Sequence, residues 1–325
     1  MPTKAPETLY SPDWIKSQLK PVLDVVNPLL SELLQYGLTL FARCANLRAS
    51  DENGDENLPI LFVYRHLLEM LDSVAIQIAE CAPAPAALQL RAMFEALLTI
   101  EYITRDKSRT RERDGISLQD GAEASTILPL SQDPNTSEGA ALQKFIAGEP
   151  FLQEWKGQDP ARIAERVTEI DKILQIPELQ AIATEYKSLR KKTRDPEWYS
   201  LFNGPANIAR LAQALNRAAS YRILYGEWSD RTHSADAIDR ILTHDASGRT
   251  YARSLRDVSE LNTAIDFAMT FTIDASRLLV RHYCPADEID FAKWYAEEVL
   301  PIRKKIPKVS QSATLRIDSI LLVVV

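Results

Sequence analysis

The sequence predicts an all-α protein, an irregular helical bundle that carries a loop-rich helical insertion. Long stretches place apolar residues at the three- and four-residue spacing of helices. The chain has only 10 glycines, few for a protein built on tight turns. Neither Asn53-Gly54 nor Asn203-Gly204 lies between alternating apolar and polar runs, so no β-hairpin is expected before the final residues.

Composition excludes several functional classes. The 325 residues are 46% apolar and 26% charged, which is ordinary for a globular protein and excludes wholesale disorder. A formal charge of −7 argues against a generally basic nucleic-acid binder. No glycine-rich phosphate-binding motif and no nucleophile-elbow motif is present, which disfavours Rossmann, P-loop and α/β-hydrolase enzymes.

The first half of the bundle is predicted from periodicity and from proline. The first helix should open at Asn27-Pro28, a capping residue followed by proline at the first helical position. The second should cover 60–82 and the third 86–104, separated by Pro83-Ala84-Pro85. Because this connection is short, the second and third helices should be antiparallel neighbours.

The second half begins with an insertion at about 105–195, a charge run followed by residues rich in Ser, Gly, Asp and Pro. Two short helices are expected within the insertion, at 160–175 and 177–193. Three further helices are expected after it, at 206–228, 250–282 and 288–300. The prolines at 196, 285 and 301 end three of them.

The predicted organisation is therefore an N-terminal extension at 1–26, a helical bundle domain at 27–285 and a C-terminal helix with an apolar tail at 286–325. The last six residues, Ile320–Val325, are apolar and mostly β-branched. They suit a final strand or a tail packed on the body; a frayed terminus and a membrane anchor are the alternatives.

The three cysteines are far apart and form no C-x-x-C pair. This predicts no disulfide framework, no structural zinc and a reducing cytoplasm. We also expect no membrane contact, because no apolar run reaches the 18 or so residues that cross a bilayer and no signal peptide is visible. No cofactor is expected. A di-iron bundle would need Glu-x-x-His motifs, which the chain lacks, so we expect no metal.

One polar constellation is unusual. Arg65 and Glu69 on the second helix, and Arg91 and Glu95 on the third, are each four residues apart and so share a helix face. Counted from the proline corner at the 1.5 Å rise of a helix, Asp72 and Glu95 both lie about 15 Å away. The two stripes could face each other as one ladder. Solvent-facing strips, a buried structural ion-pair ladder and a ligand or catalytic site are all consistent with this pattern.

A second cluster follows on the helix at 206–228 and beyond it. Tyr221 and Tyr225 are one turn apart, and Ser229, Arg231 and His233 come next. The near-neutral pKa of imidazole makes His233 the best candidate in the chain for proton transfer, although most such histidines are structural.

Together, these motifs resemble an uncharacterised bacterial helical family, domain of unknown function five-six-seven-seven. The resemblance rests on Arg-x-x-x-Glu, on Trp198, and on Tyr-x(3)-Tyr followed by Ser-x(3)-His at 221–233. It spans roughly residues 25–245. It implies a helical fold and no established activity.

More distantly, the chain resembles HEPN domains, which often act as metal-independent RNases in toxin–antitoxin and antiphage systems. Their catalytic pattern is Arg, four to six residues, then His. Here Arg231 lies two residues before His233 and Arg222 eleven before it, so neither spacing matches. Arg65 or Arg91 could supply the missing arginine in space.

Two functions remain open. The first is a non-enzymatic interaction or sensor module, for which bacterial defence is one setting and whose partner is a protein or a second copy of the chain. The second is an RNase effector with His233 as general acid/base, Arg91 or Arg231 neutralising phosphate, and Glu95 in the same site. In that case the basic runs at 105–113 and 187–194 could guide RNA, although solvated helix ends and a loop explain them as well.

Overall fold

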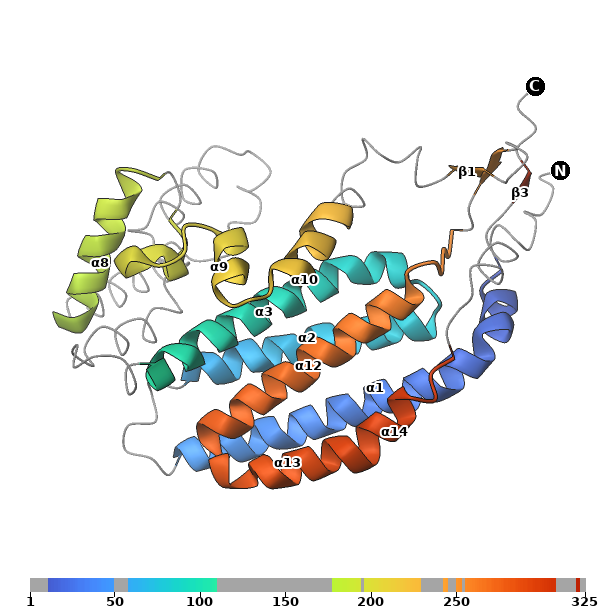
Figure 1. Cartoon of the computed structure of the whole chain (residues 1–325), viewed down its shortest axis with the longest axis horizontal. Coiled ribbons are helices and arrows are strands. Elements are labelled where there is room, and N and C mark those ends of the chain that lie inside the picture. The colour runs from blue at the N-terminus through green and yellow to red at the C-terminus, as the bar shows by residue number, and fades with distance from the viewer. Residues whose placement is uncertain are drawn as a thin grey trace, which may run out of the picture. The chain divides into compact units, whose positions relative to one another are not determined.

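A computed structural model describes residues 11–49, 58–109, 177–193, 196–228, 242–244, 250–252, 255–307 and 320–321 (Figure 1). The chain forms two compact units. The first comprises Met1–Gly54, Ile60–Thr104 and Leu215–Val325, and the second Asp55–Pro59 and Arg105–Ala214. The described part is overwhelmingly helical, which confirms the all-α class.

The first unit opens with a helix that starts earlier than predicted. Helix α1 runs from Pro12 to Ala49 and contains Pro21 and Pro28. The predicted start at Asn27-Pro28 is therefore wrong. Ile15, Leu19 and Val22 are buried at helical spacing upstream of it. Each proline removes a backbone hydrogen-bond donor from the helix. Burial of the apolar stripe offsets this loss, so the helix continues past both prolines.

The predicted helical hairpin is confirmed. Helix α2 covers Leu58–Ala79 and α3 covers Pro83–Arg109. The chain turns at Cys81, which is buried and has a φ of 56°. Proline suits the first position of α3 because the amide hydrogen that it lacks would have no partner inside the helix.

Helix α12, Leu261–Tyr283, packs along α1 and is joined to α2 and α3 by side-chain contacts. The Tyr64 and Ser276 hydroxyls are hydrogen-bonded at 2.8 Å in the core. The rings of Phe94 and Phe271 lie 5.4 Å apart between centroids. These contacts hold α2 and α3 against α12, as the arrangement of the ribbons shows (Figure 1).

Helix α12 begins later than the predicted 250–282 helix, because residues 250–252 form a strand. Strand β1, Leu242–His244, pairs antiparallel with β2, Thr250–Ala252, and β2 pairs antiparallel with β3, Ile320–Leu321. The expectation of no hairpin before the last residues is thus wrong. The expectation of a strand in the tail is confirmed for Ile320–Leu321. Strands of two or three residues are too short to show a period-two pattern in the sequence.

The C-terminal helix predicted at 288–300 is present with an irregular turn inside it. A short 3-10 turn, η7 (Pro285–Asp287), leads into α13, Glu288–Trp294, the π-helical turn η8, Tyr295–Val299, and α14, Leu300–Arg303. The ring of Trp294 stacks on Tyr36 of α1 with centroids 3.7 Å apart. This stack anchors the C-terminal helices on α1.

The helix predicted at 206–228 is three pieces. Asn216 has a φ of 60°, a left-handed conformation that interrupts a helix and that asparagine tolerates. Helix α9, Ile208–Ala214, lies before it in the second unit. Helix α10, Ala218–Arg222, and the π-helical turn η4, Ile223–Glu227, follow in the first unit.

The second unit has a small core of its own. Helix α8, Pro177–Arg190, confirms the second of the two helices predicted in the insertion. The first, at 160–175, lies outside the described residues. Ile182 of α8 and Leu201 of the 3-10 turn η3 (Trp198–Asn203) are buried together, with Tyr186, Leu189 and Trp198 packed against them.

All three cysteines, Cys44, Cys81 and Cys284, are buried and free. Within the described ranges, no helix is both long and apolar enough to cross a membrane.

Candidate functional site

Helix α3 positions the pair that the sequence singled out. Arg91 and Glu95 are one turn apart, with Arg91 Nε 3.6 Å from Glu95 Oε1. The Arg91 side chain is 34% exposed and that of Glu95 49%. The pair therefore lies at the surface of the bundle, where water can reach both groups.

The π-helical turn η4 brings Tyr225 onto this pair. The Tyr225 hydroxyl donates a hydrogen bond to the Glu95 carboxylate. The guanidinium carbon of Arg91 lies over the Tyr225 ring, 3.8 Å from its centroid, which is cation–π geometry. The π turn adds a residue to the helical repeat and so changes where a side chain points, a device that recurs at functional sites.

Tyr221 completes the arrangement from α10. Its ring stacks on that of Tyr225 with centroids 4.6 Å apart and planes inclined by 15°. We call Arg91, Glu95, Tyr221 and Tyr225 the tyrosine–arginine cluster. All four side chains lie within the first unit.

The surroundings of Tyr225 and Arg91 move the pKa of each further from neutrality. Burial raises the pKa of Tyr225, and the hydrogen bond to Glu95 raises it further. Burial alone would lower the pKa of Arg91, but the hydrogen bonds and charges of Tyr225 and Glu95 outweigh it and raise that pKa. At neutral pH Tyr225 is thus a neutral donor and Arg91 a fixed cation.

The other predicted pair lies on α2. Arg65 Nη1 is 3.2 Å from Glu69 Oε1, and His66 Nδ1 is 4.0 Å from Glu69 Oε2. These side chains are between 41% and 53% exposed, and Asp72 is exposed as well.

Of the alternatives that the pattern left open, the structure therefore agrees with solvent-facing strips and not with one inward-facing ladder. Within the described part of the chain, no hydrogen bond or ion pair joins Arg65 or Glu69 to Arg91 or Glu95. The inner faces of α2 and α3 carry fully buried leucines instead, among them Leu67, Leu71 and Leu97. Burying charges there would cost several kcal/mol each, whereas burying leucine stabilises the fold.

His233 and Arg231 fall outside the described residues, as does Ser229. Their roles as general acid/base and phosphate ligand stay predictions.

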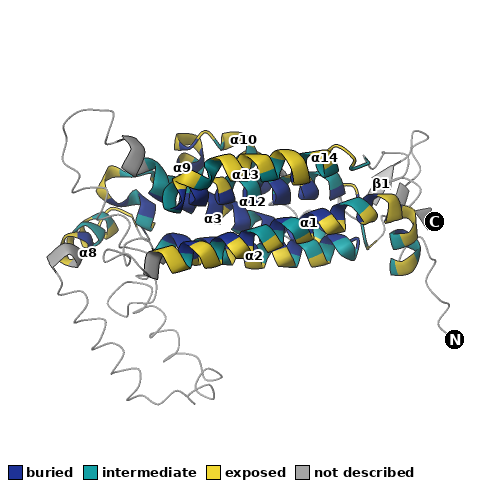
Figure 2. Cartoon of the chain, turned by 90° about the horizontal axis from the view of Figure 1, so that it is seen from below, coloured by how far each residue is buried: buried dark blue, intermediate teal, exposed yellow. Residues whose placement is uncertain are grey.

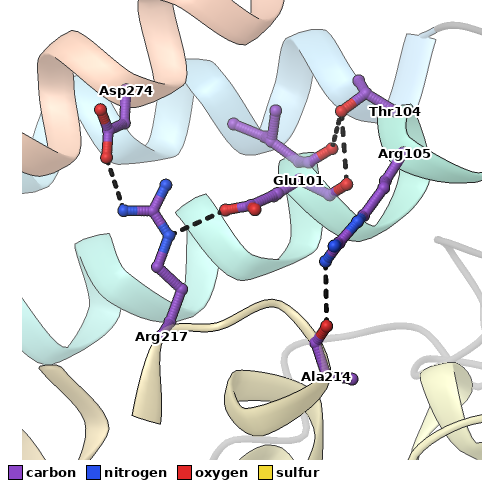
Figure 3. A network of polar contacts seen from close by, with 7 residues as sticks. Glu101, Thr104, Arg105, Ala214, Arg217 and Asp274 are labelled. Carbon is purple, nitrogen blue, oxygen red and sulfur yellow. Dashed lines mark hydrogen bonds and ion pairs between the residues drawn. The ribbon is translucent and has the colours of Figure 1, made fainter. Parts of the chain in front are cut away.

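The structure also shows a polar network that the sequence did not reveal (Figure 3). Arg217 Nε donates to Glu101 Oε2 at 2.9 Å, and its Nη1 donates to Asp274 Oδ2 at 2.6 Å. The guanidinium thus joins the segment before α10 to α3 and to α12. No local motif could have indicated this, since Arg217 is 116 residues from Glu101 and 57 from Asp274.

A separate contact belongs to the second unit. Arg105 Nη1 donates to the backbone carbonyl of Ala214 at 2.9 Å, which fixes the end of α9 (Figure 3). Both networks place arginines where they order backbone and helices, and neither leaves an unpaired acid or base at its centre.

Across the described ranges, no three His, Cys, Asp or Glu side chains gather as ligands for a metal would. The only charged groups of the tyrosine–arginine cluster, Arg91 and Glu95, are already engaged with each other and with Tyr225. What the cluster offers chemically is a rigid surface of aromatic rings, a guanidinium and a carboxylate.

The chain is similar to a known protein family. A family described as a family of unknown function (DUF5677) matches residues 57–249, more than half of the chain. Neither the curated proteins nor the solved structures returned a match. The matched range contains α2, α3, α10 and the π-helical turn, and so every member of the tyrosine–arginine cluster. The chain belongs to the DUF5677 family of unknown function.

Proposed function

We propose that this protein is a non-enzymatic interaction module and that the tyrosine–arginine cluster is the centre of the surface it presents to a partner protein. The observation that carries the proposal is the fixed geometry of Tyr225, whose hydroxyl is bonded to Glu95 while Arg91 lies over its ring.

The composition and exposure of the cluster suit recognition. Tyrosine and arginine are the residue types most enriched at the energetic centres of protein interfaces. Here Arg91 and Glu95 are one-third to one-half exposed, so a partner can reach them. Stacking and hydrogen bonding already order the rings, which lowers the entropy that association would otherwise cost.

The same contacts argue against proton transfer at the cluster. An efficient general acid or base has a pKa near the working pH. The pKa of Tyr225 and that of Arg91 are both moved further from neutrality. We also infer the bacterial cytoplasm as the compartment, and the free state of the three buried cysteines suits its reducing character.

The experiment is site-specific photo-cross-linking in the native host. A benzophenone amino acid replaces Leu88, which is 56% exposed on α3 one turn before Arg91 and lies outside the cluster, and covalent adducts are identified by mass spectrometry. We expect one defined protein adduct that is lost when the same chain also carries Arg91→Ala. Arg65→Ala is the matched control, because Arg65 has the same four-residue pairing with glutamate but no tyrosine over it.

Two results would overturn the proposal. One is an adduct pattern that Arg91→Ala and Arg65→Ala change equally. The other is cleavage of RNA by the purified protein in the presence of EDTA that His233→Ala abolishes, which would establish the RNase alternative instead.

A further inference from the structure

Exposed residues follow the outer side of α2 (Figure 2), and they include both apolar and charged side chains. Phe62 is 61% exposed and Ile76 58%, large values for side chains of this kind. His66, Glu69 and Ser73 lie between Phe62 and Ile76 on the same face of α2. From Phe62 to Ile76 the five residues are separated by four, three, four and three positions, which is the spacing of contact residues in paired helices. We call this set, with Arg65 and Asp72 beside it, the α2 seam.

Charge along the α2 seam is ordered by sign. The basic groups Arg65 and His66 lie toward the N-terminus of α2, and the acidic groups Glu69 and Asp72 toward its C-terminus. Arg65 already pairs with Glu69 at 3.2 Å. Asp72 makes no hydrogen bond or ion pair with any described residue, so its carboxylate is available to a cation from outside the chain.

We propose that the α2 seam binds a second copy of this chain, with the two α2 helices antiparallel about a two-fold axis near Glu69. An interface of this symmetry must be self-complementary, and the order of the seam meets that condition. Phe62 of one copy faces Ile76 of the other, since the two residues are placed symmetrically about Glu69. Likewise Asp72 of one copy faces His66 and Arg65 of the other.

The position nearest the axis needs separate consideration, because Glu69 of the two copies would meet there. In each copy, Arg65 forms an ion pair with Glu69 of the same chain. Two ion pairs therefore meet at the axis, and not two unpaired carboxylates. Antiparallel packing also places the positive end of each helix dipole beside the negative end of the other. A parallel pair would instead set Asp72 against Asp72.

The size of the seam sets the expected strength. Phe62 and Ile76 are about 21 Å apart along α2 at 1.5 Å per residue. One helix face of this length buries less than the roughly 800 Å² per partner of a standard stable complex. We therefore expect a concentration-dependent dimer with a dissociation constant on the order of 10–100 μM.

The first experiment measures this association on the full chain by sedimentation equilibrium. Phe62→Glu and Ile76→Glu should each raise the dimer dissociation constant at least about tenfold, since each places a charge in the apolar contact. Ile289→Glu is the matched control, because Ile289 is 69% exposed on α13 and lies off the seam. It should leave the dissociation constant within about twofold. Circular dichroism checks that the variants are folded.

The second experiment tests the antiparallel order. Asp72→Lys alone, and His66→Glu alone, which keeps Arg65 paired with Glu69, should each weaken self-association. An equimolar mixture of these two variants should form a heterodimer, because the introduced lysine of one chain then faces the introduced glutamate of the other, while the remaining Asp72 faces the native His66 and Arg65. A chain that stays monomeric up to about 500 μM overturns the proposal. The proposal is also overturned if none of the seam variants weakens the dimer, or if mixing the two charge variants does not restore dimer formation. These variants leave the tyrosine–arginine cluster on α3, α10 and η4 intact, so failure here is distinct from failure of the proposed function.

Discussion

Tyr225 donates its phenolic hydrogen to the carboxylate of Glu95, 130 residues away in the sequence. This single contact joins the π-helical turn η4 to α3 and defines the tyrosine–arginine cluster. It turns an ordinary intrahelical pair of Arg91 and Glu95 into an ordered surface. The first prediction concerns this bond.

Glu95→Gln should lower the pKa of Tyr225 toward that of a free tyrosine. Burial contributes most to the raised pKa, and the Glu95 carboxylate adds to it by hydrogen bonding and by charge. The amide keeps the shape but removes the negative charge that opposes formation of the phenolate. NMR titration of tyrosine labelled with ¹³C at the ζ carbon measures the shift. Glu69→Gln on α2 is the control and should leave the Tyr225 resonance unchanged.

Arg217→Met should destabilise the fold by about 2–3 kcal/mol, because it removes the shared partner of two partly buried carboxylates. The side chains of Glu101 and Asp274 are only 16% and 31% exposed. Urea unfolding measures the loss, and adding Glu101→Gln and Asp274→Asn to the same chain should recover part of it.

The control for that experiment is Lys20→Met. Lys20 and Asp24 form an exposed pair on α1, with side chains 69% and 58% exposed. Its loss should change stability by about 0.5 kcal/mol or less. Equal effects of the two substitutions would show that the Arg217 network does not stabilise the bundle.

Gly37→Ala should destabilise the protein by about 1–3 kcal/mol, although alanine is the better helix former. A β-carbon at position 37 would lie 2.5 Å from Leu68 Cδ2 and 3.2 Å from the Tyr64 hydroxyl oxygen. Leu68 and Tyr64 are fully buried, so neither has space into which to move. Glycine is therefore required here for the close approach of α1 to α2.

Gly226→Ala is the matched comparison, read from the same thermal or urea unfolding curves. A β-carbon there meets nothing closer than Arg222 Cγ at 4.0 Å. That substitution should be neutral or slightly stabilising. A larger loss of stability for Gly226→Ala than for Gly37→Ala would contradict the packing of α1 on α2.

The cysteines should be almost inert toward the thiol reagent DTNB in the native protein at pH 8. Burial raises the pKa of Cys81 to about 11 and moves the pKa of Cys44 and of Cys284 upward as well. The reactive thiolate is then scarce, and access to it is blocked. All three thiols should react once guanidinium chloride unfolds the chain. Rapid labelling of the folded protein would contradict the burial of Cys44 and Cys284, or that of Cys81 at the turn between α2 and α3.

The sequence alone determined the helical class, the α2–α3 hairpin and the pairing of Arg65 with Glu69 and of Arg91 with Glu95. Those features depend on interactions within one helix or across one short turn, so the spacing of residues close together in the sequence is enough to predict them. Tertiary structure decided the rest. Burial of Ile15 and its neighbours allowed α1 to continue past two prolines. The left-handed conformation of Asn216 interrupted the helix predicted at 206–228. Only the packing of distant segments could bring Tyr225 to Glu95 and Arg217 to Asp274. It also turned both charged stripes toward water, because the free energy of burying leucine is favourable and that of burying an ion is not.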